Sequence, residues 1–240
     1  MCPPLISTMP GIAPLLLASL NPETRRQAEQ NLHALSSQPG LLAAILHLIL
    51  DASQDRSVRL AASVFLKNTI KRRWGDEDAP MQDAEKTQLK SQLVPTMIAL
   101  SAPTDKTLRA QVAETVSVIA KFDFPEQWPD LIDQLVASLS PDANNYPTNV
   151  SVLETAHSIF APWRAEMRSD SLYTTINFVL GRFVDTFLKI FEHTATNLLN
   201  GTGTDAMAQA QVVLLSIFYD LTCQDLPPAF EDSQNAFFWS

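Results

Sequence analysis

Residues 64–74 read VFLKNTIKRRW, and this stretch, with the residues just before it, decides the fold class. Its apolar residues recur at helical spacing. The set that shares one side of a helix is Val58, Ala61, Ala62, Phe65, Thr69 and Ile70. Lys67 and Lys71 are four residues apart, so a helix places them next to each other on a different side. The stretch therefore predicts an amphipathic helix over about 55–73, with Asp55 as its cap and a basic C-terminal end.

The rest of the chain shows the same helical period, and no convincing alternation of strand type occurs. Asn21, Pro22 and Glu23 form a helix-start signal, since they supply a capping side chain, a proline for the first turn and an acid at the positive dipole end. Pro125 is expected to open a helix in the same way. The further predicted helices cover residues 22–36, 41–50, 82–100, 104–120, 125–139, 148–167, 172–199 and 205–224, with another element beginning at Pro227.

The spacing of these helices predicts an all-α fold. The helices form antiparallel pairs that repeat about every 40 residues, a period typical of HEAT repeats. Such a pair cannot bury its apolar face alone and stacks on its neighbours, so we expect an α-solenoid, a right-handed superhelical array. A compact helical bundle is the alternative, and it requires long-range returns that the even spacing does not suggest. The second helices of the pairs, near 22–36, 55–73, 104–120, 148–167 and 205–224, are expected to line the concave face.

Composition narrows the classes of function. Hydrophobic residues make up 46% of the 240 residues, which is enough for a core, whereas glycine occurs only 6 times. An α/β enzyme would need more glycine for its turns and phosphate loops. The net charge of −9 disfavours nucleic-acid binding, which requires a basic surface. The basic cluster at 67–73, set in an acidic chain, suits a protein partner instead.

Cysteine content and apolar runs indicate the compartment. Cys2 and Cys223 are the only cysteines, so no disulfide framework is expected and a reducing compartment is indicated. Cys223 follows an apolar helix and is interpreted as a small buried residue. The N-terminus has no basic region ahead of its proline-interrupted apolar run, so we predict no signal peptide. The longest apolar run, 41–50, is too short for a membrane span.

Residues that suggest chemistry mostly have a structural explanation. His33, His47, His157 and His193 lie singly on predicted helices, so no metal site is expected. Trp74 and Trp128 are interpreted as helix-end packing. Asp130 and Asp133 are expected on an exposed helix edge, with no nucleophile or base beside them. No phosphate-binding glycine loop occurs. We therefore expect neither a cofactor nor an enzyme.

Several segments resemble the importin-β superfamily of nuclear transport receptors. Residues 22–35, PETRRQAEQNLHAL, are similar to the opening of its N-terminal domain, and VRLAA at 58–62 with FLKNTIK at 65–71 is similar to its signature helix. A second set resembles the exportins of that superfamily that return importin-α to the cytoplasm. It comprises DFPEQWP at 123–129, AHSIF at 156–160, WR at 163–164, RSD at 168–170, YDLTCQDLP at 219–227 and FED at 230–232.

The resemblance implies partners and a site. It implies that the concave N-terminal helices contact the GTP-bound form of the small GTPase Ran, with Lys67, Asn68, Lys71 and Arg72 as candidate contacts. An ordinary solvated face is the alternative for these residues, and Asn68 can also hydrogen-bond a neighbouring turn. Importin-α is the implied cargo, and nucleoporins are implied partners of the full-length receptor. The implied location is nucleus and cytoplasm, with passage through the nuclear pore, and neither nucleic-acid binding nor membrane insertion is expected.

The chain is expected to be one array over 1–240. Its importin-β N-terminal-type region covers about 21–100, and further HEAT-like repeats cover 101–240, the last of them truncated. The apolar C-terminal end lacks a polar capping repeat, so an N-terminal fragment is expected, with Phe230, Phe237 and Phe238 uncovered and fraying. Two alternatives to an importin-α exporter stay open: the arm of an import receptor of the same type, and a HEAT scaffold without GTPase contact.

Overall fold

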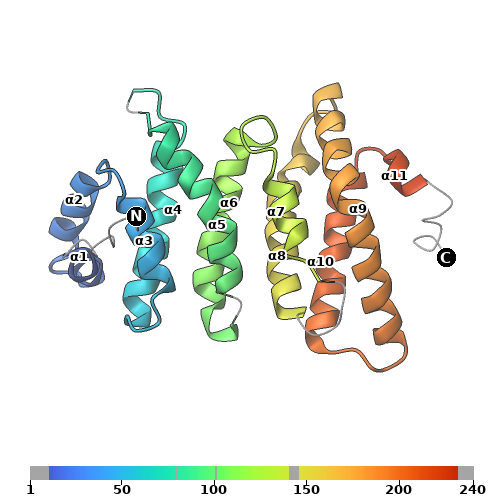
Figure 1. Cartoon of the computed structure of the whole chain (residues 1–240), viewed down its shortest axis with the longest axis horizontal. Coiled ribbons are helices and arrows are strands. Elements are labelled where there is room, and N and C mark those ends of the chain that lie inside the picture. The colour runs from blue at the N-terminus through green and yellow to red at the C-terminus, as the bar shows by residue number, and fades with distance from the viewer. Residues whose placement is uncertain (1–10, 79, 101, 141–145, 232–240) are drawn as a thin grey trace, which may run out of the picture. The chain divides into compact units, whose positions relative to one another are not determined.

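The computed structural model describes residues 11–78, 80–100, 102–140 and 146–231. This described part contains helices and turns and no strand, so the all-α prediction is confirmed (Figure 1). The helices are α1 (Ile12–Ser19), α2 (Arg25–Leu35), α3 (Leu41–Leu50), α4 (Arg56–Arg73), α5 (Asp83–Ala99), η1 (Pro103–Asp105), α6 (Lys106–Asp123), α7 (Leu131–Ala137), α8 (Tyr146–Phe160), η2 (Ala161–Ala165), α9 (Asp170–Leu199), α10 (Asp205–Thr222) and α11 (Pro228–Glu231).

Residues 1–122 form the first of two compact units, and residues 123–240 form the second. In the first unit, α1 packs on α2 and α4, and α3 packs on α4 and α5. Gly40 links α2 to α3 with a φ of 83°, a left-handed conformation that glycine adopts without steric cost. The apolar face of α3 is completely buried at Leu41, Ile45 and Ile49. Consecutive helices therefore share one core, as expected for stacked pairs.

A buried arginine connects successive helix pairs in the first unit. Arg59, on α4, is only 9% exposed. Its Nε donates to the carbonyl of Ile49 at the end of α3 (2.8 Å), and its Nη1 pairs with Asp105 just before α6 (3.3 Å). Arg109 occupies the corresponding fourth position of α6 and donates to the carbonyl of Leu100, just past α5 (3.0 Å). Each arginine thus satisfies a carbonyl that the end of an α-helix leaves without a partner.

In the second unit, α7 packs on α9, α8 packs on α10, and α9 packs on α10 and α11. An aromatic cluster fills the space beneath α11. Phe230 is 1% exposed, and its ring lies 5.1 Å from Phe218 and 6.1 Å from Phe187 between centroids. The expectation that Phe230 lies uncovered is therefore wrong, because α9 and α10 already bury it. Phe237 and Phe238 lie outside the described residues.

A buried carboxylate joins α8, η2 and α10. The side chain of Asp220, on α10, is 0% exposed. Its Oδ2 lies 2.6 Å from Nδ1 of His157, on α8, and its Oδ1 accepts from Nε of Arg164, on η2. Arg164 also lies over the ring of Tyr219, 4.7 Å from its centroid. A buried carboxylate requires such partners. Here they come from α8 and η2, which both pack on α10.

Most predicted helices occur within a few residues of their expected bounds, with four differences. The helix expected over 148–167 ends at Phe160 and is followed by the separate 3₁₀ helix η2. The helix expected from Pro125 begins at Leu131, because residues 124–130 form turns whose amides at Gln127 and Trp128 donate to the carbonyl of Asp123. Asn21 caps a turn through the amide of Glu23 (3.0 Å), and α2 starts only at Arg25. Helix α1 was not predicted, since prolines interrupt the apolar sequence around it. No helix within the described ranges has the length and apolar character needed to cross a membrane.

The buried carboxylate in the second unit yields a prediction about stability. We expect Asp220→Ala to lower the free energy of unfolding by about 1–3 kcal/mol, the cost of leaving buried polar groups unpaired. The loss stays in this range because the side chains of Arg164 and His157 are 35% and 34% exposed and regain water. Urea unfolding followed by circular dichroism measures the loss. Asp185→Ala, on the exposed side of α9, is the control and should change the value by less than about 0.5 kcal/mol. Equal losses in both variants would contradict the assignment.

Candidate functional site

Helix α4 carries the predicted contact residues, and its start is fixed by a cap. Oδ1 of Asp55 accepts from the amide and the hydroxyl of Ser57, at 2.8 and 2.7 Å. These two hydrogen bonds hold the pKa of the Asp55 carboxyl below its usual range. The charge also lies at the positive end of the helix dipole, where a carboxylate is favoured. Asp55 therefore caps α4 as the sequence predicted.

The buried face of α4 is rotated from the predicted one. Val58, Ala62, Thr69 and Ile70 are buried as expected, but Leu66 is buried as well. Ala61 and Phe65 are only half-buried. They line a groove of about 600 Å³ between α1, α2 and α4. The prediction for Ala61 and Phe65 was wrong because helical period alone cannot separate a core face from the wall of a groove.

The groove has an apolar floor and a polar rim. The apolar lining comes from three helices and includes Leu16, Leu20, Leu32, Leu60, Val64 and Phe65. Arg25 and Glu29, which form an ion pair of 3.0 Å, stand on the α2 side with His33. Asn68 and Arg72 stand on the α4 side. An apolar groove with a few polar groups at its edge is a typical binding surface.

The structure divides the predicted basic cluster into engaged and free cations. Lys67 is not a free cation: its Nζ lies 3.0 Å from Glu114 of α6, and its side chain is 18% exposed. Arg73 donates to the carbonyl of Ser36. Lys71 and Arg72 are exposed, and neither forms an ion pair or side-chain hydrogen bond with another described residue. The expectation that Lys67 and Lys71 form one exposed stripe therefore holds only for Lys71.

The C-terminal end of α4 has a rigid and partly buried surrounding. Trp74 is 2% exposed, and Nζ of Lys86 lies 5.2 Å from its ring centroid while donating to its carbonyl (3.0 Å). Burial raises the pKa of Glu85, and the nearby guanidinium of Arg73 partly offsets the shift. Trp128 is 1% exposed, so the packing role predicted for both tryptophans is confirmed. These contacts fix the helix end from which Lys71 and Arg72 project.

Of the remaining candidates, Cys223 differs from its prediction, whereas Asp133 lies on an exposed helix edge as expected. Cys223 is exposed, so its predicted burial is wrong: it lies past the last turn of α10, where the helix no longer covers it. Asp133 pairs with Arg182 of α9 (3.4 Å) and is 60% exposed. Within the described ranges, no three His, Cys, Asp or Glu side chains are grouped as metal ligands.

Two structural networks were missed by sequence reasoning. The buried arginines follow an aspartate by four residues in two places, as Asp55 with Arg59 and Asp105 with Arg109. This spacing repeats after fifty residues and was available as a signal. The Asp220 network had no such signal, because its three members lie 56 and 63 residues apart and meet only through packing.

Family models match three consecutive parts of the chain. The importin-beta N-terminal domain matches residues 28–99, which include most of α2, all of α3 to α5 and the α4 side of the groove. An exportin 1-like model matches residues 105–171, and the Cse1 model matches residues 159–238. The chain therefore belongs to the importin-β superfamily of nuclear transport receptors, which are not enzymes.

Individual relatives narrow this class. The importin alpha re-exporter of Saccharomyces cerevisiae is 36% identical over 236 residues, 95% of this chain and 24% of the relative. The importin-alpha re-exporter of Schizosaccharomyces pombe is also 36% identical, with the same shares covered. Exportin-2 of Homo sapiens is 32% identical over 220 residues, 89% of this chain and 22% of the relative. The chain is thus a homologue of the Cse1/exportin-2 proteins and spans about a quarter of their length.

Solved structures agree with this result. The exportin Cse1 in its cargo-free, cytoplasmic state matches with a TM-score of 0.85 and 36% identity, over 97% of this chain and 25% of that one. The matched region is a HEAT solenoid, which confirms the predicted fold class. Lph2, a bidirectional nuclear transport receptor of S. cerevisiae, matches with a TM-score of 0.76 over 93% of this chain and 22% of that one. Its identity of 19% supports a shared fold only.

The cap of α4 yields a prediction about pH. Because its pKa is lower in the folded state, Asp55 stabilises the fold above the pKa of an unfolded aspartate. That contribution is lost as the pH falls through the lower, folded-state pKa. We therefore expect Asp55→Ala to destabilise at neutral pH and to differ little from the unmodified chain in strong acid. Asp55→Asn keeps an acceptor without the charge and should flatten the pH dependence. Urea unfolding across the acid range tests both, and a constant gap between Asp55→Ala and the unmodified chain would refute the assignment.

Proposed function

We propose that this chain is the Ran-binding N-terminal arm of an importin-α export receptor. The observation that carries the proposal lies within the matched importin-beta N-terminal domain: Asn68 and Arg72 line an apolar groove from α4, and the exposed Lys71 is next to Arg72 in the same helix. Lys71 and Arg72 hold no partner among the described residues, so their full hydrogen-bonding capacity is open to another protein. The groove supplies apolar area, and the two cations supply orientation.

Export rather than import is favoured by the second half of the chain. The Cse1 model matches residues 159–238, which belong to the second unit, and the relatives that align over 95% of the chain are named as importin-alpha re-exporters. We infer that importin-α is the cargo of the longer protein. Transport in this direction requires that the GTPase and the cargo bind together, each raising the affinity for the other. The receptor would then shuttle between nucleus and cytoplasm, with nucleoporin contacts made by the complete protein.

The structure changes which lysine is the better test of GTPase binding. Reversing the charge of Lys67 would set a new carboxylate against Glu114 and break the ion pair that joins α4 to α6. Reversing the charges of Lys71 and Arg72 alters only exposed side chains. The Lys67→Glu/Glu114→Lys double variant exchanges the charges and keeps the pair. It therefore separates a structural role of Lys67 from a contact role.

We expect Lys71→Glu with Arg72→Glu to weaken binding of GTP-bound Ran by about 1–3 kcal/mol, through lost charged hydrogen bonds and new repulsion. The free energy of unfolding should change by less than about 0.5 kcal/mol, since both side chains are exposed. Binding is measured by calorimetry with the GTP-bound and GDP-bound GTPase, and the GDP-bound form should bind weakly to every variant.

Lys106→Glu is the control for reversal of one exposed lysine outside the groove, next to the Arg56–Thr107 hydrogen bond that joins the first turns of α4 and α6. It should leave the affinity unchanged within about twofold. Equal affinities for both nucleotide states in all variants would mean that α4 presents only solvated surface. Equal losses for Lys106→Glu and the double reversal would mean that net charge alone, and not the groove, governs the interaction.

A further inference from the structure

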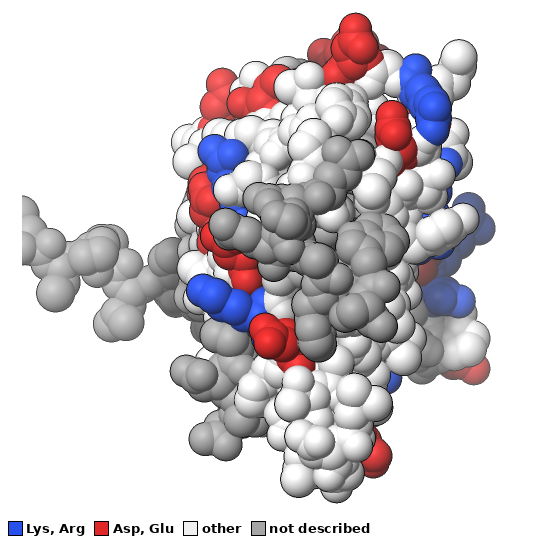
Figure 2. All heavy atoms as spheres, turned by 90° about the vertical axis from the view of Figure 1, so that its right-hand side faces the viewer, with Lys and Arg blue, Asp and Glu red and all other residues white. Residues whose placement is uncertain are grey.

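The second unit differs sharply from the first in charge. Residues 123–240 carry four basic and fifteen acidic side chains, a net charge of −11, whereas residues 1–122 carry thirteen basic and eleven acidic ones, a net charge of +2. Figure 2 looks onto the side of the chain that bears its C-terminal elements, and there the acidic atoms occur in several separate groups. Charge alone therefore favours a basic partner for this unit but does not locate the contact.

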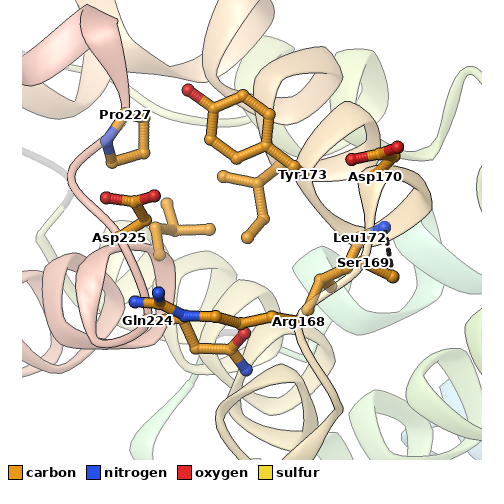
Figure 3. Close-up of a pocket in the computed structure, with 10 residues that line it drawn as sticks. Arg168, Ser169, Asp170, Leu172, Tyr173, Gln224, Asp225 and Pro227 are labelled. Atoms are coloured by element: carbon orange, nitrogen blue, oxygen red, sulfur yellow. Dashed lines mark hydrogen bonds between the residues drawn. The ribbon is translucent and has the colours of Figure 1, made fainter.

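A pocket of about 350 Å³ supplies a location. One wall is the N-terminal part of α9, with Ser169, Leu172, Tyr173 and Ile176, and the other is the end of α10 and the segment after it, with Leu221, Gln224, Asp225 and Pro227. Figure 3 shows the ring of Tyr173 reaching from α9 toward Pro227 and Asp225 across the hollow. The volume lies in the range of ligand pockets and accommodates a long side chain with neighbouring backbone.

The pocket is held open by hydrogen bonds that do not involve its rim charges. Nε2 of Gln224 donates to the carbonyls of Trp163 and Glu166, at 2.8 Å each, which ties the end of α10 to the segment before α9. Asp220, one turn earlier on α10, holds Arg164 of η2. The Ser169 hydroxyl caps α9 through the amide of Leu172 (3.2 Å), as the dashed line in Figure 3 marks. Both walls are thus fixed before any ligand arrives, which lowers the entropic cost of binding.

The lining combines three features that suit a cationic side chain. Leu172, Ile176 and Leu221 are at most 7% exposed and form an apolar floor for an aliphatic stem. The ring of Tyr173 is 39% exposed and presents a π face. Asp225 stands across from that ring, is exposed, and forms no ion pair with another described residue.

Two further charges lie at the rim of the pocket. Asp170 stands on the far side of Tyr173, and the guanidinium of Arg168 extends toward the side that carries Asp225 and Gln224 (Figure 3). Neither is ion-paired within the described part of the chain. The three rim charges sum to −1, the same sign as the surrounding unit. A cation is therefore favoured over an anion, and Arg168 is the group that opposes it.

We propose that this pocket binds a lysine or arginine side chain from a basic peptide segment of a partner protein. The aliphatic stem lies on the apolar floor, and the charged end lies between the Tyr173 ring and the Asp225 carboxylate. The proposal does not rest on GTPase binding, because the groove at α4 belongs to the other unit. Failure of either proposal leaves the other standing.

The test uses the 240-residue chain and two capped, fluorescein-labelled peptides, Gly-Leu-Lys-Lys-Leu-Gly and Gly-Leu-Glu-Glu-Leu-Gly, with affinity measured by fluorescence anisotropy. We expect the lysine peptide to bind at least about tenfold more tightly than the glutamate peptide, since one lost charged hydrogen bond corresponds to about that factor. Asp225→Asn should weaken the lysine peptide about tenfold, and Tyr173→Ala several-fold. Asp225→Asn removes only the charge of an exposed residue, and Tyr173→Leu is the second variant at the aromatic position should Tyr173→Ala unfold.

The Arg168→Ala variant tests whether the bound ligand is positively or negatively charged. If the pocket holds a cation, removing Arg168 should strengthen the lysine peptide by about two- to fivefold, because a like charge is removed. Weaker binding of the lysine peptide, or stronger binding of the glutamate peptide, would overturn the proposal. Asp185→Asn removes the same charge from the exposed side of α9, outside the pocket lining. The affinity of this variant for the lysine peptide should stay within about twofold of the unmodified chain. If Asp185→Asn weakened the lysine peptide as much as Asp225→Asn does, the peptide would be attracted by the acidic unit in general and not by the pocket. Absence of lysine-peptide binding would likewise reject the site.

Discussion

The buried Arg59 guanidinium is the constraint on which the first unit depends. A guanidinium cannot lose its charge, so burial to 9% exposure requires acceptors for its donors. The chain supplies them from the end of the preceding helix, at Ile49, and from the start of the next pair, at Asp105. One side chain thereby connects α3, α4 and η1. Arg109 repeats the contact to the preceding helix end, so the stacking of helix pairs follows from a local rule applied twice.

The second unit meets the same requirement with the opposite charge. Asp220 is a buried acceptor, and its donors come from α8 and η2 rather than from an adjacent helix end. In both units a buried charge fixes the register of helices whose apolar faces alone would permit sliding. The binding surfaces lie beside these fixed points: the groove beside α4 in the first unit, and the pocket beside the end of α10 in the second. Rigid helices thus hold exposed polar groups in place, which suits recognition of protein partners.

The division of the basic cluster shows how packing assigns roles to similar residues. Lys67, Lys71, Arg72 and Arg73 look alike in sequence, yet two of them stabilise the fold and two are available to a partner. The division follows from what each side chain meets. Lys67 reaches Glu114 of α6, whereas Lys71, one turn further along α4, is exposed, and Arg72 lies exposed at the rim of the groove. A receptor arm built this way can vary its partner contacts without altering its stacking.

The sequence by itself determined the helical class, the approximate bounds of most helices and the cap of α4 at Asp55. Helical period and caps are local properties, so they are legible without coordinates. Tertiary structure alone decided that Lys67 pairs with Glu114, that Ala61 and Phe65 line a groove, and that Phe230 is covered. These outcomes depend on which neighbour a side chain meets, and partners some fifty residues apart are brought together only by packing.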